Sequence, residues 1–378
     1  MSSLQEQERR PRGRRVVVVG QSAWPDLPPE LLERIVAVVG PRDRVAVRLV
    51  CASWRACVRD SFPSDLPFEA PRLLLRRPGI GAGLAFFSLH HRKLLPFALP
   101  ASIGAGRCCG HFAGWLAMAF DADRSMLLCN LVSGQSVAVP PPPVFPVSKV
   151  VLSAPPTSPG WVAAALGRTG TMALLVSGGG AWMTVGVDEG AQHGGFRDAA
   201  FWRGRLCALG HDGAVLTFRG DLRARFAAVS VLREADHPVG ALAGGCWALY
   251  LVASDAQDEL LLVRRLYTVR LRSDAVELRV EVRALLSAGW GPPMEEMPGR
   301  AVFVGSVASA VVEAAAGLYG GGGGGLRESC VYFARREVEM LAPHAICEYS
   351  MADDEMRGVP IDGGHSADVD PVWINPVV

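Results

Sequence analysis

The chain has 378 residues, half of them hydrophobic, and its 38 basic and 37 acidic side chains leave a formal net charge of +1. This length allows two or three average domains, or one small module followed by one large domain. Because the charges nearly balance, no overall field directs the chain to nucleic acid or to an anionic membrane. We therefore expect neither nucleic acid nor a membrane as a partner.

The amino-terminal segment, residues 1–21, is polar and rich in arginine, and its short valine run is too brief for the core of a signal peptide. We expect a disordered leader that is either a nuclear localisation signal or a solvated tail. The nine cysteines are odd in number and irregularly spaced, which is typical of reduced thiols. These features predict a location in the nucleus, the cytoplasm or both.

A short amphipathic helix is predicted directly after this leader. Asp26 is a good N-cap, and Pro28 or Pro29 suits the first helical turn. Gly40 and Pro41 are a matching stop signal. Placed at about 100° per residue, the apolar side chains fill one broad arc: Leu31, Leu32, Ile35, Val36, Val38 and Val39.

Two further short helices are expected, one from about residue 43 to 50 and one starting near residue 53. Three short helices in about 40 residues are close to the size limit for independent folding. The broad apolar arc therefore indicates either a small core plus a groove for an outside partner, or a helical hairpin packed on the main domain.

The residues that form this pattern resemble the F-box over roughly residues 22–62. The matching positions are Leu27-Pro28-x-Glu30-Leu31-Leu32, then Ile35, Asp43 and Val50-Cys51-x-x-Trp54-Arg55; the stretch Val47-Arg48-Leu49 departs mildly from the family. The resemblance implies docking to a Skp-family adaptor, and through it to a cullin. The residues expected to fill the adaptor groove or to support the helices that do so are Leu27, Pro28, Leu31, Leu32, Ile35, Val50, Cys51 and Trp54.

After a short linker, the pattern from about residue 70 onward changes to short β segments separated by glycine and proline turns. The first four predicted strands cover residues 72–75, 84–89, 126–130 and 136–140. The later ones cover residues 162–166, 172–176, 181–185, 206–209, 214–218, 246–252, 259–265, 278–282, 302–304 and 330–333.

A weak internal repeat favours a closed ring of blades. Residues 112–118 and 202–209 share an aromatic-x-Gly-x-Leu pattern, and Gly114 and Gly204 lie 90 residues apart. That spacing equals about two four-stranded blades, so the domain would hold about six or seven. We expect an acidic loop over residues 353–370 to lead back to Trp373, which would close the ring. A sandwich or several small sheets remain alternatives.

This region is similar to the KIB-type β-propeller domain of plant F-box proteins over roughly residues 66–378. The likeness is carried by residues 109–116, 128–134, the prolines at 140–143, residues 201–209, 250–265 and 330–333, and Trp373. The expected fold is thus a small all-α F-box module followed by an all-β propeller-like domain. The resemblance implies that the propeller recognises a target protein, but it supplies no substrate-binding residues.

Motifs for catalysis or cofactor binding are not found in the sequence. There is no nucleotide-binding P-loop, zinc-protease motif, nucleophile elbow or paired Cys-x-x-Cys. Cys108-Cys109-x-His111 lacks a second ligand pair for zinc, and His211-Asp212 is read as a solvated turn rather than an acid–base pair. Trp182 and Trp290 are either interface anchors or packing residues. We expect no catalytic residue, no metal and no cofactor.

Three functional hypotheses follow. The first is a non-catalytic substrate-recognition subunit of an SCF-type cullin-RING ubiquitin ligase. The second is an F-box protein that binds its adaptor but acts outside ubiquitin transfer. The third is an enzyme in the propeller channel, which requires histidines and carboxylates to converge at one channel mouth.

Overall fold

The structure is a computed structural model, and the chain divides into two compact units, Met1–Leu66 and Pro67–Val378. The expected leader and linker lie outside the described residues. The structure describes residues 27–38, 47, 50, 51, 53, 54, 71–76, 84–89, 93–96, 106–131, 134–185, 191–219, 227–232, 247–254, 256–270, 275–286, 289–314, 326–334, 346–359 and 371–374.

The first unit contains helix α1 (Pro29–Val38), as the sequence predicts. The carbonyl of Pro28 accepts hydrogen bonds from the N–H groups of Leu31 and Leu32, which starts the helix. The expected cap and stop residues lie outside the described part, as do most residues of the two further helices. At the positions that are described there, the backbone is helical: Val47, Val50, Ser53 and Trp54.

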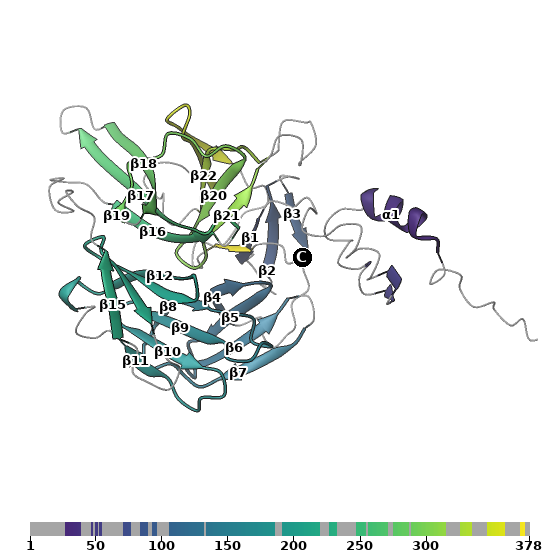
Figure 1. Cartoon of the computed structure of the whole chain (residues 1–378), viewed down its shortest axis with the longest axis horizontal. Coiled ribbons are helices and arrows are strands. Elements are labelled where there is room, and N and C mark those ends of the chain that lie inside the picture. The colour runs from purple at the N-terminus through teal and green to yellow at the C-terminus, as the bar shows by residue number, and fades with distance from the viewer. Residues whose placement is uncertain are drawn as a thin grey trace, which may run out of the picture. The chain divides into compact units, whose positions relative to one another are not determined.

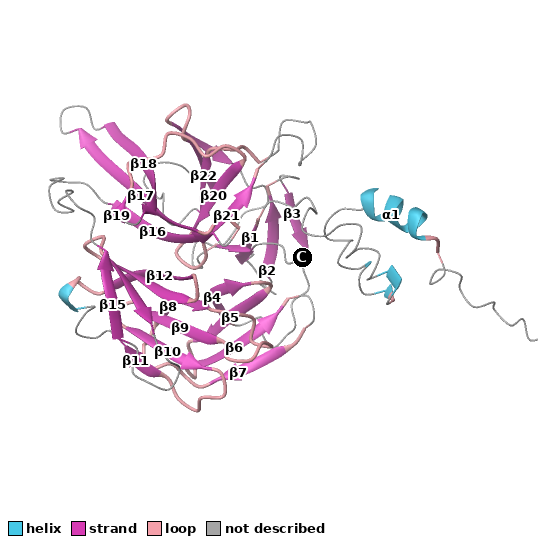
Figure 2. Cartoon of the chain, in the orientation of Figure 1, coloured by secondary structure: helices cyan, strands magenta, loops and turns pink. Residues whose placement is uncertain are grey.

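Six sheets form a ring in the described part of the second unit, and we number these blades in chain order (Figures 1 and 2). Blade 1 contains β25 (Val372–Ile374), β1 (Arg72–Arg76), β2 (Leu84–Ser88) and β3 (Lys93–Pro96). Blade 2 contains β4 (Arg107–Phe112), β5 (Trp115–Phe120), β6 (Ser125–Asn130) and β7 (Ser136–Val139). Blade 3 contains β8 (Val147–Leu152), β9 (Val162–Gly167), β10 (Met172–Val176) and β11 (Met183–Val185).

The remaining blades come from the second half of the unit. Blade 4 contains β12 (Phe196–Trp202), β13 (Arg205–Gly210), β14 (Val215–Arg219) and β15 (Ala227–Leu232). Blade 5 contains β16 (Trp247–Ser254), β17 (Glu259–Arg270), β18 (Ala275–Leu286) and β19 (Gly289–Trp290). Blade 6 contains β21 (Ala310–Glu313), β20 (Arg300–Val304), β22 (Cys330–Ala334), β23 (Ile346–Ser350) and β24 (Glu355–Val359).

The ring is closed by the last strand of the chain. β25 pairs antiparallel with β1, with Trp373 opposite Leu73, so the final strand completes the first blade. The indole N–H of the buried Trp373 donates to the Val304 carbonyl at 2.9 Å, which also joins blade 1 to blade 6. The expected closure by Trp373 is therefore confirmed. The expected acidic loop is partly wrong, because β24 occupies residues 355–359 and pairs with β23.

Blade 6 departs from the simple up-and-down order of the other blades. Here β20 pairs antiparallel with β21 on one side and parallel with β22 on the other. Along the chain, β20 comes first but lies second in the sheet, and β21 then forms the edge beside it. The chain next crosses to the other side of β20, where β22 lies third in the sheet. No pattern in the sequence predicts this crossover.

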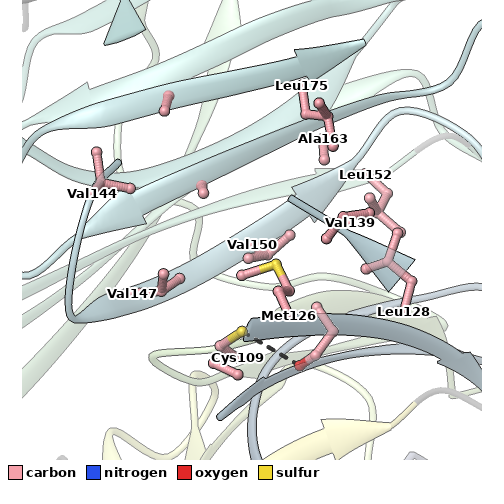
Figure 3. Packing of buried hydrophobic residues seen from close by; sticks show 14 of the residues in the cluster. Cys109, Met126, Leu128, Val139, Val144, Val147, Val150, Leu152, Ala163 and Leu175 are labelled. Atoms are coloured by element: carbon pink, nitrogen blue, oxygen red, sulfur yellow. Dashed lines mark hydrogen bonds between the residues drawn. The ribbon is translucent and has the colours of Figure 1, made fainter. Parts of the chain in front are cut away.

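Six apolar clusters hold the ring together, one between each pair of neighbouring blades. Strand β5 shows how they arise: Trp115 and Ala117 face blade 3, whereas Leu116 faces blade 1. Because successive side chains point to opposite faces and both faces are buried, the strand reads as a continuous apolar run. Figure 3 shows part of the cluster between blades 2 and 3, where the Cys109 thiol also donates to the Ala117 carbonyl at 3.4 Å.

The first strands of blades 2, 3 and 4 each carry a register shift, at residues 108–110, 147–149 and 196–198. Such bulges redirect side chains at the end of a ladder. Gly110 follows the first of them, and a Cβ placed there would lie 2.3 Å from the Val150 carbonyl oxygen. The close approach of β4 to β8, the first strands of blades 2 and 3, therefore requires glycine at position 110.

Candidate functional site

A cavity of about 380 Å³ lies within the ring and is lined by residues from all six blades. The ends of β4, β8, β12 and β16 contribute to its wall, together with the segment 307–311 and Trp373. The space remains open because many wall residues have small side chains: Ala199, Ala200, Ala253, Ala256, Ala308 and Ala310. The cavity is thus a product of ring closure, since no single blade could form it.

The cavity wall includes Lys149, which is one member of a buried ion pair. The Lys149 ammonium donates to the Asp198 carboxylate at 2.5 Å, and each side chain is only 6% exposed. The same carboxylate accepts hydrogen bonds from the backbone N–H groups of Ala199 and Leu251 at 2.7 and 2.8 Å. Asp198 therefore connects blades 3, 4 and 5. Both charged residues directly follow the register shifts of β8 and β12.

The rim of the cavity is built from hairpin turns. In the β4–β5 turn Ala113 and Gly114 both have positive φ angles, 44° and 77°, and in the β12–β13 turn Arg203 and Gly204 have 51° and 67°. Two successive positive φ values are typical of the tight hairpins that match strand twist. The two turns lie two blades apart, which confirms the internal repeat. The six sheets of the described residues give a ring of six blades.

An exposed cation is fixed on this rim. The Arg203 guanidinium makes a bidentate pair with Asp258, at 2.7 and 2.6 Å, and stacks over the Trp202 ring with its Cζ atom 4.4 Å from the ring centroid. The hydrogen bonds raise the pKa of Arg203 and lower the pKa of Asp258. The pair joins the hairpin of blade 4 to that of blade 5. Three half-buried aromatic residues also belong to the lining, and they pack on the clusters between blades: Phe112, Phe201 and Trp202.

His111 is the histidine of the cavity lining. Its Nε2 atom accepts a hydrogen bond from the Gly114 N–H at 3.4 Å, and burial lowers the pKa of the imidazole to about 4. The side chain is therefore neutral at physiological pH. The remaining ionisable groups in the lining are Lys149 and Arg203, and none of the described lining residues is a carboxylate.

The convergent acid–base cluster required by the enzyme hypothesis does not occur among the described residues of this cavity. Across the described chain, no group of three histidine, cysteine or acidic side chains gathers as a metal site. Cys108 and Cys109 point into different clusters, so they do not converge with His111. Burial raises the pKa of Cys109 to about 12, so its thiol stays protonated.

Other candidate residues have structural partners. His211 and Asp212 are both exposed in a turn, as expected, and Asp212 also pairs with the buried His193 at 2.7 Å. Trp182 donates to the Pro140 carbonyl at 2.7 Å and packs on the cluster between blades 2 and 3. Trp290 packs on the cluster between blades 4 and 5. Both tryptophans fit the packing alternative.

The predicted adaptor-binding residues separate into two groups in the first unit. Leu32 and Trp54 are buried together with Val47, and Leu27 and Cys51 pack against them. The other group is more accessible: Leu31 is 48% exposed, Val50 is 54% exposed, Pro28 is exposed and Ile35 is half-buried. In the part of the chain that the structure describes, no helix is long and apolar enough to cross a membrane.

Lys149 and Arg203 of the cavity lining, and Asp198, the ion-pair partner of Lys149, were not predicted as a site. The aromatic-x-Gly repeat did mark the two rim hairpins, but nothing in the local sequence pairs Lys149 with an aspartate 49 residues away. The pairing depends on the order of the blades, which sequence periodicity does not specify.

Together, the fold defines a six-bladed β-propeller preceded by a unit that contains a helix. Comparison with protein families matches residues 86–356 to the KIB1-4 beta-propeller and residues 24–62 to the F-box-like domain. The chain belongs to the KIB1-4 beta-propeller family and carries an F-box-like domain. This architecture fits an adaptor type of protein that binds a substrate without catalysing its conversion.

Other comparisons give only distant likenesses. A search of curated proteins finds no match. Among solved structures, the chain resembles one from a nidogen/laminin complex, with 10% identity, a TM-score of 0.40, and coverage of 80% of this chain and 96% of that one. It also resembles the N-terminal domain of Nup159, with 10% identity and a TM-score of 0.33, over 55% of this chain and about half (54%) of that one. Likenesses at this level say nothing about function.

Proposed function

We propose that this protein is the substrate-recognition subunit of an SCF-type cullin-RING E3 ubiquitin ligase. Its F-box-like domain would dock on a Skp-family adaptor and through it on a cullin, while the propeller would hold the target protein. The observation that carries this proposal is the pairing of an F-box-like domain, residues 24–62, with the KIB1-4 propeller, residues 86–356, in one chain.

The packing of the first unit supports adaptor docking. Leu32, Val47 and Trp54 supply the small buried cluster, so they would support the helices rather than touch a partner. Leu31 and Val50 leave apolar side chains in solvent. Burying a side chain of this size contributes roughly 1.5–3 kcal/mol, so an adaptor groove that covers both would gain appreciable affinity.

On this proposal the subunit needs no catalytic group of its own. It would raise the rate of ubiquitin transfer by proximity, because a bound target presents its lysines at high effective concentration near the charged enzyme. Such a complex would assemble in the nucleus or the cytoplasm.

The test is co-purification of the tagged full chain with a Skp-family adaptor and a cullin. The double variant Leu31→Asp/Val50→Asp should lose both partners, because two charges would enter an apolar contact. The matched control is Glu33→Ala/Arg34→Ala, which alters exposed polar residues of the same helix and should keep both. Leu32 is left intact, since a carboxylate at this buried position would disrupt the unit itself.

Retention of the adaptor by the double variant would refute the docking assignment. Retention of the adaptor by the wild type without any cullin would instead favour an F-box protein that acts outside ubiquitin transfer.

A further inference from the structure

The described lining of the cavity contains two cations and no acid. Lys149 and Arg203 are lining residues, whereas their carboxylate partners, Asp198 and Asp258, are not. Each ion pair therefore presents its positive member to the cavity. Oriented in this way, the two pairs favour negatively charged oxygen atoms inside the ring.

The Lys149 ammonium has hydrogen-bond donors to spare. An ammonium group carries three N–H donors, and the described residues offer it one acceptor, the Asp198 carboxylate. The Lys149 side chain is only 6% exposed, so two buried donors remain without a protein acceptor. Asp198 also accepts from the backbone N–H groups of Ala199 and Leu251, so it keeps partners when Lys149 binds a second acceptor. Because buried donors without acceptors are costly, an oxygen atom at Lys149 would be held firmly.

Two further lining residues keep a donor without an acceptor among the described residues. His111 is neutral because burial lowers its pKa to about 4, and its Nε2 atom accepts from the Gly114 N–H, so the ring proton lies on Nδ1. The Ser153 hydroxyl oxygen accepts from the Val162 N–H at 2.8 Å, which leaves its O–H as a donor. The lining thus offers donors from several side chains and no carboxylate to accept in return.

We propose that this cavity binds a carboxylate group, whose oxygen atoms accept hydrogen bonds from Lys149. An ionised carboxylate only accepts hydrogen bonds, and those from an ammonium group are about twice as strong as bonds between neutral groups. Arg203 lies in the turn after β12, whereas Asp198, the partner of Lys149, lies near the start of that strand. Arg203 would therefore attract the anion at the rim, and Lys149 would hold it inside.

The carboxylate site itself rests on the lining alone. Two sources share its chemistry: an acidic side chain of the target protein, which rests on the proposed function, and a free organic acid.

Lysine NMR tests the site directly, because the chain contains two lysines, Lys93 and Lys149. The full chain is labelled with [ε-13C]lysine, and the variant Lys93→Arg assigns the two signals. The probe is the α-amide of N-acetyl-L-glutamic acid, and its uncharged and cationic counterparts are N-acetyl-L-glutaminamide and N-acetyl-L-argininamide.

The Lys149 signal should shift saturably with the acidic probe, with a Kd on the order of 1 mM. Both counterparts should bind at least tenfold more weakly. The signal of Lys93 should not follow, because this residue belongs to β3, the strand of blade 1 farthest from the Trp373 strand that reaches the cavity.

A charge placed on the lining tests the location. Ala256→Asp adds a carboxylate at an exposed turn residue of the lining and should weaken binding at least threefold at low ionic strength by repulsion. Ala256→Asn has nearly the same shape without the charge and should leave the Kd within twofold. Ala191→Asp, at an exposed alanine outside the lining, should do the same.

Four results would overturn the proposal: no saturable shift of Lys149, an equal shift of Lys93, equal binding of the glutamine probe, or equal loss in all three alanine variants. Butanoate separates the two sources. Binding of the amide probe at least as tight as that of butanoate supports a side chain that enters with its backbone, whereas binding of butanoate alone supports a free organic acid. These outcomes are independent of adaptor binding, which the Leu31→Asp/Val50→Asp variant reports separately.

Discussion

The two units of the chain treat their apolar residues in opposite ways. In the propeller, apolar side chains are buried in six clusters between blades. In the short first unit, one cluster of three buried residues coexists with exposed Leu31 and Val50. Two other large apolar side chains in the described chain are also exposed, Met183 and Leu286. The ring buries most of its apolar side chains between blades, whereas the first unit leaves two of them exposed.

The largest expected effect concerns closure of the ring. Trp373→Ala should lower the free energy of unfolding by about 3–5 kcal/mol, because it removes a buried ring from the cluster between blades 6 and 1 and the hydrogen bond to Val304. Chemical denaturation measures the change. Trp182→Ala, at a half-buried tryptophan that also donates one hydrogen bond, should cost less. Equal losses would mean that closure by β25 contributes little.

The buried ion pair should come next. Asp198→Ala removes one partner of the pair and two backbone hydrogen bonds, and leaving Lys149 buried and unpaired should cost about 3–5 kcal/mol. The double variant Lys149→Met/Asp198→Leu should recover part of this loss in the same denaturation assay. Asp258→Ala breaks an exposed pair, so its effect should be far smaller. A harmless Asp198→Ala variant would contradict the role of this pair.

Two neighbouring leucines of α1 make the sharpest comparison within the first unit. Leu32→Ala empties part of the buried cluster and should cost about 2–5 kcal/mol. Leu31→Ala changes an exposed side chain and should stay within about 0.5 kcal/mol. Hydrogen exchange of residues 27–38 in the free chain distinguishes the two. Similar acceleration in both variants would mean that Leu31 also belongs to the core.

A smaller effect depends on pH. Burial lowers the pKa of His111 to about 4, whereas an unfolded histidine titrates near 6.5. Between about pH 6.5 and 4 the unfolded state binds a proton at this histidine that the folded state does not. The free energy of unfolding should therefore fall as the pH is lowered through this range. His111→Gln should remove this part of the pH dependence, measured as the difference between the two unfolding profiles. Identical profiles would show that His111 is solvated.

The smallest effect is on thiol reactivity. Burial raises the pKa of Cys207 to about 12 and that of Cys129 to about 11, so these thiols should react slowly with iodoacetamide at pH 8. The half-buried Cys51 of the first unit should be labelled before them. Peptide mapping over time gives the order. Faster labelling of Cys207 would indicate that its blade opens.

The strands differ in how clearly the sequence marks them. Strand β9 is buried along its whole length and reads as an unbroken apolar run, so it was predicted at residues 162–166. Strands β8 and β12 were missed, because Lys149 and Asp198 interrupt their apolar pattern and register shifts disturb their alternation. Strands β17 and β18 extend beyond the predicted residues 259–265 and 278–282.

The apolar face of α1 could be predicted from the sequence, whereas the cavity within the ring could not. The apolar arc of α1 is local, since residues three and four apart share a face, and the pattern therefore located Leu31 and Leu32. Periodicity alone did not tell which of them is buried, because Leu32 is covered by Val47 and Trp54 from later in the chain. The cavity needs residues from six blades, so no local pattern could have revealed it.

We propose that the adaptor covers the exposed apolar residues of the first unit, Leu31 and Val50. Its most direct test is the Kd of the purified full chain for a purified Skp-family adaptor, measured by calorimetry for the wild type, Leu31→Asp and Arg34→Asp. We expect tight binding of the wild type and of Arg34→Asp, and at least a hundredfold weaker binding of Leu31→Asp. Equal affinity of all three proteins, or no binding by the wild type, would contradict docking of the adaptor on this apolar surface.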